Sequence, residues 1–152
     1  MRVSLFQNEK IESTLYLLLR IGLGLVFVYA SLDKIWYPGL FAKSIANFKI
    51  LPLPFLHAAA IILPWMEFLT GLALILDRYP RAANLIIGLL TGIFTMAIIS
   101  AMLRGLNFNC GCFNLDSTEA NIGILKVLEN LLLLGVSVLL EMRFRKALHL
   151  KS

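Results

Sequence analysis

Four long apolar stretches alternate with shorter polar segments along the chain. They cover residues 15–37, 57–76, 82–103 and 122–140. Because about 20 mostly apolar residues are needed to cross the hydrocarbon core of a bilayer, each stretch is predicted to be a membrane-spanning helix. The five-residue connection 77–81 makes the second and third helices a hairpin. The pattern therefore predicts an all-α membrane protein, a four-helix transmembrane bundle.

The first stretch is the least uniformly apolar, since it contains Arg20, Asp33 and Lys34. We expect Arg20 to snorkel or to find a partner, and Asp33 and Lys34 to mark the opposite membrane surface. The third stretch has no charged residue. The charges of the second and fourth stretches are Glu67, Lys126 and Glu129.

Two longer loops, 38–56 and 104–121, connect the helices on one side. We expect the first loop to lie on the membrane surface, because it combines aromatic residues with the stiff run Leu51-Pro52-Leu53-Pro54. Within the third helix, Gly88 and Gly92 have the spacing of close helix packing.

Lysine and arginine favour one orientation of this bundle. Eight of them fall on the side of the two termini and four on the side of the long loops, so both termini are predicted to be cytoplasmic. The domain boundaries follow as a cytoplasmic segment 1–14, a transmembrane domain 15–141 and a basic cytoplasmic tail 142–152. We expect an integral protein of a bacterial cytoplasmic (inner) membrane.

The chain is 59% hydrophobic and carries a net charge of +5, with a mean hydropathy of +0.83. The bilayer is thus its solvent and membrane lipid its first partner. Basic residues beside spanning helices are explained by orientation and by anionic lipid, so a nucleic-acid partner is not expected.

The chain has only two cysteines, and they stand one residue apart in Cys110-Gly111-Cys112. Gly111 permits the bend that brings two such sulfurs within disulfide distance. The small ring is strained, which favours exchange over a structural role. The predicted topology places the pair outside the cytoplasm, where disulfides persist.

Other interpretations of the cysteines remain open. The two thiols could stay unreacted or form a small structural clip. No metal is expected, because zinc takes four ligands and the two histidines, His57 and His149, are predicted on opposite sides of the membrane.

Four polar residues are predicted near the cysteines on the outer face. Thiol exchange needs a thiolate, which nearby cations stabilise, and Lys34, His57 and Arg104 are the candidates. Asp33 would orient one of them or accept its proton. Each residue taken alone is better explained as an anchor at the membrane interface, and it is their common location that makes them a candidate site.

Glu67 is predicted to lie deep in the bundle. Intramembrane charges are functional candidates, so Glu67 either handles protons or contacts a quinone head group, or it forms a structural ion pair with Arg20. Lys126 is an alternative partner for Glu67 and shares a helix face with Glu129. The candidate lining of a quinone site comprises Glu67, Arg20, Trp36, Trp65 and Phe68.

Several of these motifs together resemble the DoxX/MauE family of redox-associated membrane proteins. They are Arg20-x-x-x-Gly24 leading to Asp33-Lys34, Pro64-x-x-Glu67-x-x-x-Gly71, and Arg104-Gly105 before Cys110-Gly111-Cys112-Phe113. The resemblance implies a four-helix membrane protein in thiol or sulfur redox chemistry. MauE-like members serve maturation of a disulfide-rich dehydrogenase subunit, and DoxD-like relatives belong to a thiosulfate:quinone oxidoreductase.

Two positions depart from the family pattern. Asn114 stands where a glycine often follows Cys-Gly-Cys-Phe, and Glu129 stands where a basic residue often precedes the helix-four Asn130. The second departure removes an expected basic partner of Glu67.

These observations predict a membrane thiol-disulfide oxidoreductase or electron relay. Cys110 and Cys112 would exchange electrons with an extracytoplasmic thiol or disulfide protein, or a sulfur compound, and with a membrane quinone. We expect the chain to act in a complex or oligomer. The alternatives are a non-enzymatic scaffold with a structural Cys-Gly-Cys clip and, third, a small-molecule transporter.

Overall fold

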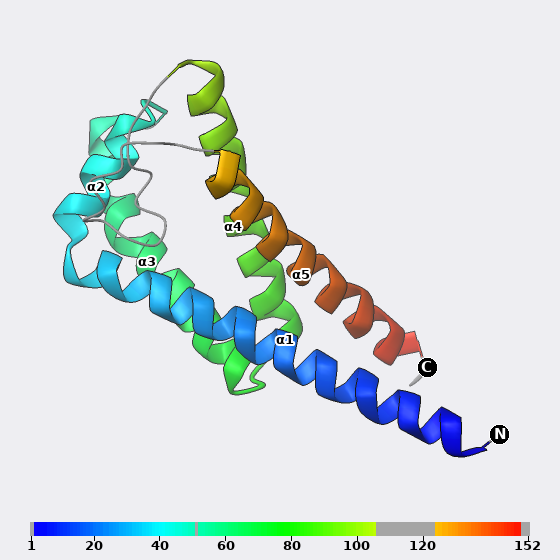
Figure 1. Ribbon diagram of the computed structural model, residues 1–152. Coiled ribbons are helices and arrows are strands. Elements are labelled where there is room, and N and C mark those ends of the chain that lie inside the picture. Colours follow the sequence, from blue (N-terminus) through cyan, green and yellow to red (C-terminus); the bar gives the residue numbers. More distant parts are fainter. Residues whose placement is uncertain (1, 51, 106–123, 150–152) are drawn as a thin grey trace.

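The computed structural model describes residues 2–50, 52–105 and 124–149 of the 152-residue chain. Over these residues every regular element is a helix (Figure 1). The helices are α1 Arg2–Trp36, α2 Pro38–Asn47, α3 Leu53–Ile75, α4 Pro80–Leu103 and α5 Ile124–His149.

Three segments of these helices are long and apolar enough to cross a membrane: Ser13–Trp36, Pro54–Ile75 and Pro80–Leu103. They correspond to the first three predicted spans. The fourth predicted span is helical from Ile124 onward, but α5 is more polar and continues to His149. Helix α1 likewise begins well before the apolar stretch. Both extensions have a common cause, since polar residues such as Glu, Lys and Arg favour helix without lengthening an apolar run.

Helix α2 lies within residues 38–56, where the sequence predicts a loop. Pro38 occupies the first turn of α2, where its missing N–H costs nothing. Phe41, Ala42 and Ile45 then pack against Leu56 and Ala60 of α3. A ten-residue helix escapes a search for membrane spans because it is too short to cross.

Helices α1 and α3 make the closest packing of the fold. A Cβ atom added to Gly24 would lie 2.8 Å from the carbonyl oxygen of Gly71, and one added to Gly71 would lie equally close to that of Gly24. The two backbones are therefore in contact, as small residues allow in membrane helices. Gly88 of α4 also packs closely, against Ser137 of α5, whereas Gly92 has open space around it.

Polar contacts join α4 to α5 at two levels. The Asn84 side-chain amide donates to the Ser137 carbonyl at 2.9 Å, and the Ser137 hydroxyl donates to Asn84 Oδ1 at 3.1 Å. Nearer the α3–α4 turn, Arg81 pairs with Glu141 at 3.1 Å. We call this end of the molecule the turn end and the opposite end the α2 end. The start of α1 and the end of α5 lie together on the side of the turn end (Figure 1).

Candidate functional site: a buried lysine–glutamate pair

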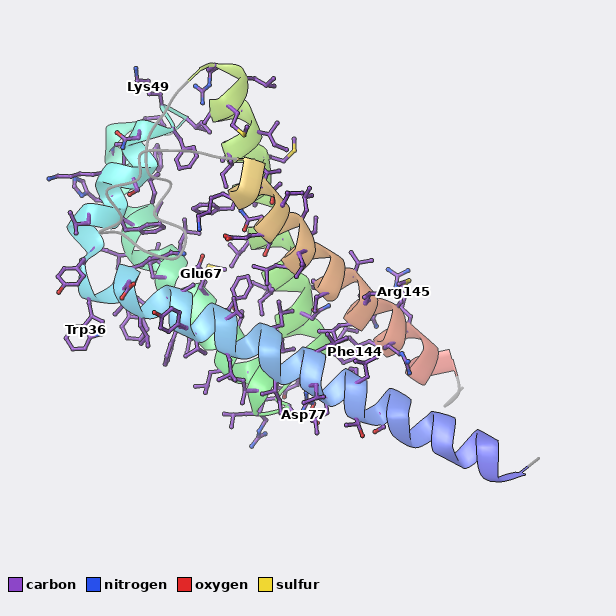
Figure 2. The ribbon with its side chains drawn as sticks, viewed as in Figure 1. Trp36, Lys49, Glu67, Asp77, Phe144 and Arg145 are labelled. Atoms are coloured by element: carbon purple, nitrogen blue, oxygen red, sulfur yellow. The ribbon has the colours of Figure 1, made fainter. Side chains whose placement is uncertain are left out.

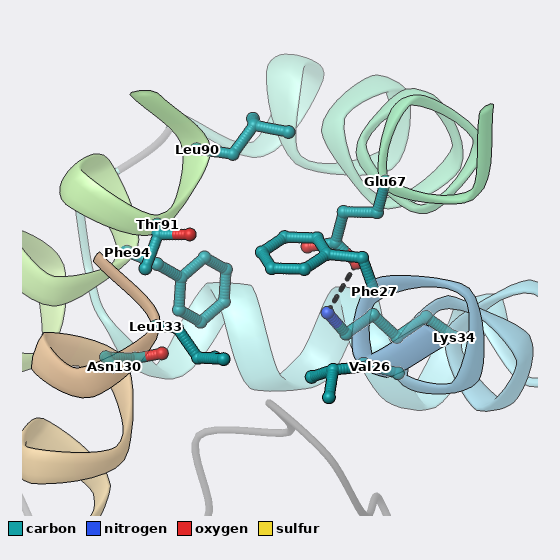
Figure 3. A pocket seen from close by; sticks show the side chains of 10 residues that line it. Val26, Phe27, Lys34, Glu67, Leu90, Thr91, Phe94, Asn130 and Leu133 are labelled. Atoms are coloured by element: carbon teal, nitrogen blue, oxygen red, sulfur yellow. Dashed lines mark hydrogen bonds and ion pairs between the residues drawn. The ribbon is translucent and has the colours of Figure 1, made fainter. Parts of the chain in front are cut away.

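A buried ion pair joins α1 to α3. Lys34 lies in the last turn of α1 and its Nζ donates to Oε2 of Glu67 at 2.7 Å. The Lys34 side chain is 4% exposed and that of Glu67 9%. Glu67 points into the space between the helices (Figure 2), and Lys34 meets it there (Figure 3). Such charge-assisted hydrogen bonds are strong, and they offset part of the cost of burying the two charges.

The pair lies at about the middle of the spanning helices. Glu67 shares a cavity with Thr91, which at 1.5 Å per residue is about 17 Å from either end of α4. Lys34 was expected to mark a membrane surface, whereas the structure buries its side chain among the helices. Helix α1 ends against the middle of α3, and α2 covers the remainder of α3, so a lysine near the end of an apolar stretch is buried.

Aromatic rings surround the ammonium group of Lys34. Its Nζ lies 5.2 Å from the ring centroid of Phe41 and 5.6 Å from that of Phe94. Both distances are within the range of cation–π attraction, which strengthens in a desolvated site. Phe41 is fully buried. Helix α2 therefore contributes directly to the environment of the charge.

A small cavity of about 30 Å³ adjoins the pair. It is large enough for about one water molecule. Four helices line it: α1, α3, α4 and α5 (Figure 3). Its lining residues are Val26, Phe27, Ala30, Lys34, Glu67, Leu90, Thr91, Phe94, Asn130 and Leu133.

The cavity is apolar apart from a few polar groups beside the pair. Thr91 donates its hydroxyl to the Ile87 carbonyl, and Asn130 is buried, 6% exposed, on the α5 side. Lys34 has three N–H donors, of which one is directed to Glu67. The arrangement can therefore present a cationic donor to an acceptor placed in the interior, while the glutamate orients the lysine or exchanges a proton with it.

Arg20 is not the partner of Glu67. It forms an ion pair with Asp77 at the turn end, where it ties α1 to the α3–α4 connection. A pairing of Arg20 with Glu67 was one of the predictions, and it fails because helix pairing and the depth of each charge are not visible in one sequence. Arg20 thus lies apart from the cavity.

The three aromatic residues predicted to line a quinone site do not line this cavity. Trp36 is 75% exposed and Trp65 50%, and Figure 2 shows Trp36 on the outside of the helices. Phe68 packs edge to face against Trp65, with ring centroids 6.2 Å apart, and does not line the cavity. The aromatic residues around Lys34 are Phe27, Phe41 and Phe94. A single sequence carries no signal that distinguishes these phenylalanines from the others.

The remaining polar candidates lie in separate parts of the fold. Arg104 donates to the Phe48 carbonyl at 2.6 Å and thus connects the end of α2 to the end of α4. His57 is exposed near the start of α3, and Asp33 is half-buried beside Lys34 in sequence. Lys126 pairs with Glu129 at 3.0 Å, which confirms one of its two predicted pairings.

Cys110 and Cys112 lie outside the described residues. Their predicted proximity to Lys34, His57 and Arg104 remains a prediction. Among those three cations, Lys34 is buried in the interior, whereas His57 and Arg104 are exposed.

The helices and their buried charges define an all-helical integral membrane protein. The sequence profile of methylamine utilisation protein MauE matches residues 12–142, and the chain belongs to this family. The match includes both members of the Lys34–Glu67 pair and confirms the resemblance seen in the motifs.

Two relatives are methylamine utilization proteins MauE. The protein from Methylophilus methylotrophus is 28% identical over 128 residues, covering 84% of this chain and 67% of the relative. The protein from Paracoccus denitrificans is 31% identical over 121 residues, covering 79% of this chain and 64% of the relative. The chain thus spans about two thirds of the length of these relatives. No solved structure matches it.

Proposed function

We propose that the protein is a membrane thiol–disulfide redox protein that exchanges electrons between Cys110/Cys112, an extracytoplasmic partner and a membrane quinone. The observation that carries this proposal is the buried Lys34–Glu67 pair beside a cavity. A buried intramembrane charge costs free energy and marks functional sites. The only thiols of the chain form a Cys-x-Cys pair, and a redox reaction of this pair would explain why the two charges are buried.

The proposed topology has α5 as a fourth spanning helix and both termini in the cytoplasm. The 26 residues of α5 reach about 39 Å, enough to cross the hydrocarbon core. Its charges Lys126 and Glu129 pair with each other, which lowers the cost of burying them. The common position of the start of α1 and the end of α5 supports an even number of crossings (Figure 1).

This orientation puts Cys110 and Cys112 on the outer side of a bacterial inner membrane. One thiolate attacks the disulfide of a partner, or the pair's own disulfide is attacked by a partner thiolate, and the second cysteine resolves the mixed disulfide. The exchange with quinone balances as two thiols plus quinone giving one disulfide plus quinol. Two electrons and two protons pass in either direction while one S–S bond forms or breaks.

Lys34 and Glu67 have distinct parts in this exchange. Lys34 donates a hydrogen bond to a quinone oxygen and stabilises the negative charge that develops there. Glu67 holds the ammonium in position and takes up or returns a proton. We propose that the physiological partner belongs to a methylamine utilisation system, in keeping with the names of the relatives. The chain would act there as an accessory redox subunit.

The test compares single and double cysteine variants in cells and in lipid vesicles. Cys110→Ser or Cys112→Ser should accumulate a mixed disulfide with a partner, because the resolving thiol is missing. Wild type in vesicles should change its thiol state when a quinone or quinol is added, and either single variant should not. Wild-type function of the double variant would instead establish the rival, a non-enzymatic scaffold with a structural clip.

A further inference from the structure

A second hollow lies on the outside of the helices near the α2 end. It is an apolar groove of about 480 Å³ between α2, α3 and α4, within the size range of small-molecule sites. Ile93 and Met96 on its α4 side are 59% and 70% exposed, so the groove opens toward lipid. Its lining residues are Ile45, Phe48, Ile50, Leu63, Ile93, Phe94, Met96, Ala97 and Ser100.

Phe94 separates this groove from the lysine cavity. It lines both spaces. On one side its ring faces the Lys34 ammonium at 5.6 Å, and on the other it meets Phe48 edge to face at 6.1 Å. A phenylalanine moves by rotation about two side-chain bonds. Rotation of Phe94 would join the groove to the cavity and leave Lys34 at its inner end.

A quinone can reach Lys34 from the groove only if Phe94 moves, because of the sizes of the two spaces. The cavity of about 30 Å³ beside Lys34 holds a water molecule but no quinone ring. The groove is large enough for a ring with the first part of its tail, but by itself it offers only Ser100 as a polar side chain. Neither space alone combines room for a quinone ring with a cationic donor, whereas the two joined provide an apolar channel that ends at Lys34.

A second opening toward the cavity lies between α1 and α5. It shares Val26 and Leu133 with the cavity and has a volume of about 380 Å³. Unlike the groove, it is lined by the Lys126–Glu129 ion pair. An apolar tail placed there would desolvate these charges, which is costly. The groove is therefore the entrance suited to a lipophilic molecule.

We propose that an isoprenoid quinone enters sideways from the bilayer, with its tail in the α2–α4 groove and its head displacing Phe94 to reach Lys34. This inference rests on the quinone exchange of the proposed function and assigns its site. The depth of Lys34 selects the ligand. A quinone oxygen is an acceptor that travels within the hydrocarbon layer, whereas a phospholipid keeps its polar groups at the interface and offers Lys34 only an acyl chain.

The test uses the full chain in phosphatidylcholine vesicles and a photoreactive azido-ubiquinone, with labelled peptides identified by mass spectrometry. Wild type should be labelled on α4 at Ile93, Met96 or Ala97, and unlabelled ubiquinone should compete. Ala97→Trp fills the groove and should lower labelling about tenfold. Leu89→Trp is the matched control, because Leu89 is 64% exposed on α4 but does not line the groove.

The outcomes separate this inference from the proposed function. Three results would overturn the groove as the quinone site: labelling of Leu132 on the α1–α5 side, unchanged labelling of Ala97→Trp, or no competition by ubiquinone. The last result would identify the groove as a lipid-binding site. If Ala97→Trp fails to fold, the positions labelled in the wild type still show whether the quinone binds in the groove. Labelling in the groove without a quinone-dependent change of thiol state would support the site and refute the redox exchange.

Discussion

The Lys34 ammonium and the Glu67 carboxylate, 33 residues apart in sequence, meet at 2.7 Å in the interior of the helices. The pair connects the last turn of α1 to the middle of α3, and α2 closes over it through Phe41. It therefore contributes both to the packing of three helices and to the proposed chemistry. The two contributions are separable by experiment.

Lys34→Met should leave Glu67 as an uncompensated buried charge and destabilise the protein by about 3–5 kcal/mol. Glu67→Met should act similarly, but the double variant Lys34→Met/Glu67→Met should recover much of the loss. Thermal unfolding in detergent measures the cycle. Recovered stability without recovered quinone exchange would separate the chemical role from the structural one.

Lys126→Met is the control for this cycle. Its ion pair with Glu129 is partly exposed, with side-chain exposures of 35% and 40%, so its loss should cost much less, about 1 kcal/mol or below. If Lys126→Met lowered the unfolding free energy as much as Lys34→Met, the burial of the Lys34–Glu67 pair would not explain the large loss expected there.

Gly24→Ala and Gly71→Ala should each force α1 away from α3. The added Cβ would meet the opposite carbonyl oxygen at 2.8 Å, and a backbone atom cannot rotate away. We expect a loss of about 1–3 kcal/mol in unfolding free energy for each substitution. Gly22→Ala on the same helix meets nothing within 4 Å and should be neutral or slightly stabilising. Equal effects at Gly22 and Gly24 would argue against the close contact.

Ser137→Ala should weaken the α4–α5 contact modestly. It removes the hydroxyl that donates to Asn84 but retains the Ser137 carbonyl that accepts from the Asn84 amide. Hydrogen bonds between membrane helices contribute about 0.6 kcal/mol on average and up to about 1.7. Asn84→Ala removes both interactions and should cost more. The measurement compares the unfolding free energies of Ser137→Ala and Asn84→Ala. A larger loss for Ser137→Ala would refute the assignment of these two hydrogen bonds.

Arg104→Gln should loosen α2. Arg104 holds the Phe48 carbonyl at 2.6 Å, so its loss frees the end of α2 from α4. Hydrogen exchange followed by mass spectrometry should show faster exchange of the amides of α2, with α3 unchanged. Arg81→Gln at the turn end is the control, because its partner Glu141 lies on α5. Slow exchange in α2 after Arg104→Gln would show that the packing of Phe41 and Ile45 suffices to hold the helix.

The apolar stretches predicted the helices of the described residues well, except where length misled the interpretation. Helix α2 is too short to be recognised as a membrane span. The polar ends of α1 and α5 continue as helix beyond the apolar stretches. The sequence identifies the interior charges as candidate site residues, but most of the predicted ion-pair partners are wrong. Glu67 was considered with Arg20 or Lys126, whereas Lys34 is the residue that reaches it.

The sequence by itself determined the membrane environment, the helical class and the family, because each of these follows from composition, local periodicity or short motifs. Tertiary structure alone decided which charges meet and which phenylalanines surround them. The physical reason is that a membrane helix makes its backbone hydrogen bonds within itself and forms wherever an apolar run is long enough. The depth at which α1 ends against α3 depends on contacts such as Gly24 with Gly71, and it is this depth that buries Lys34 beside Glu67.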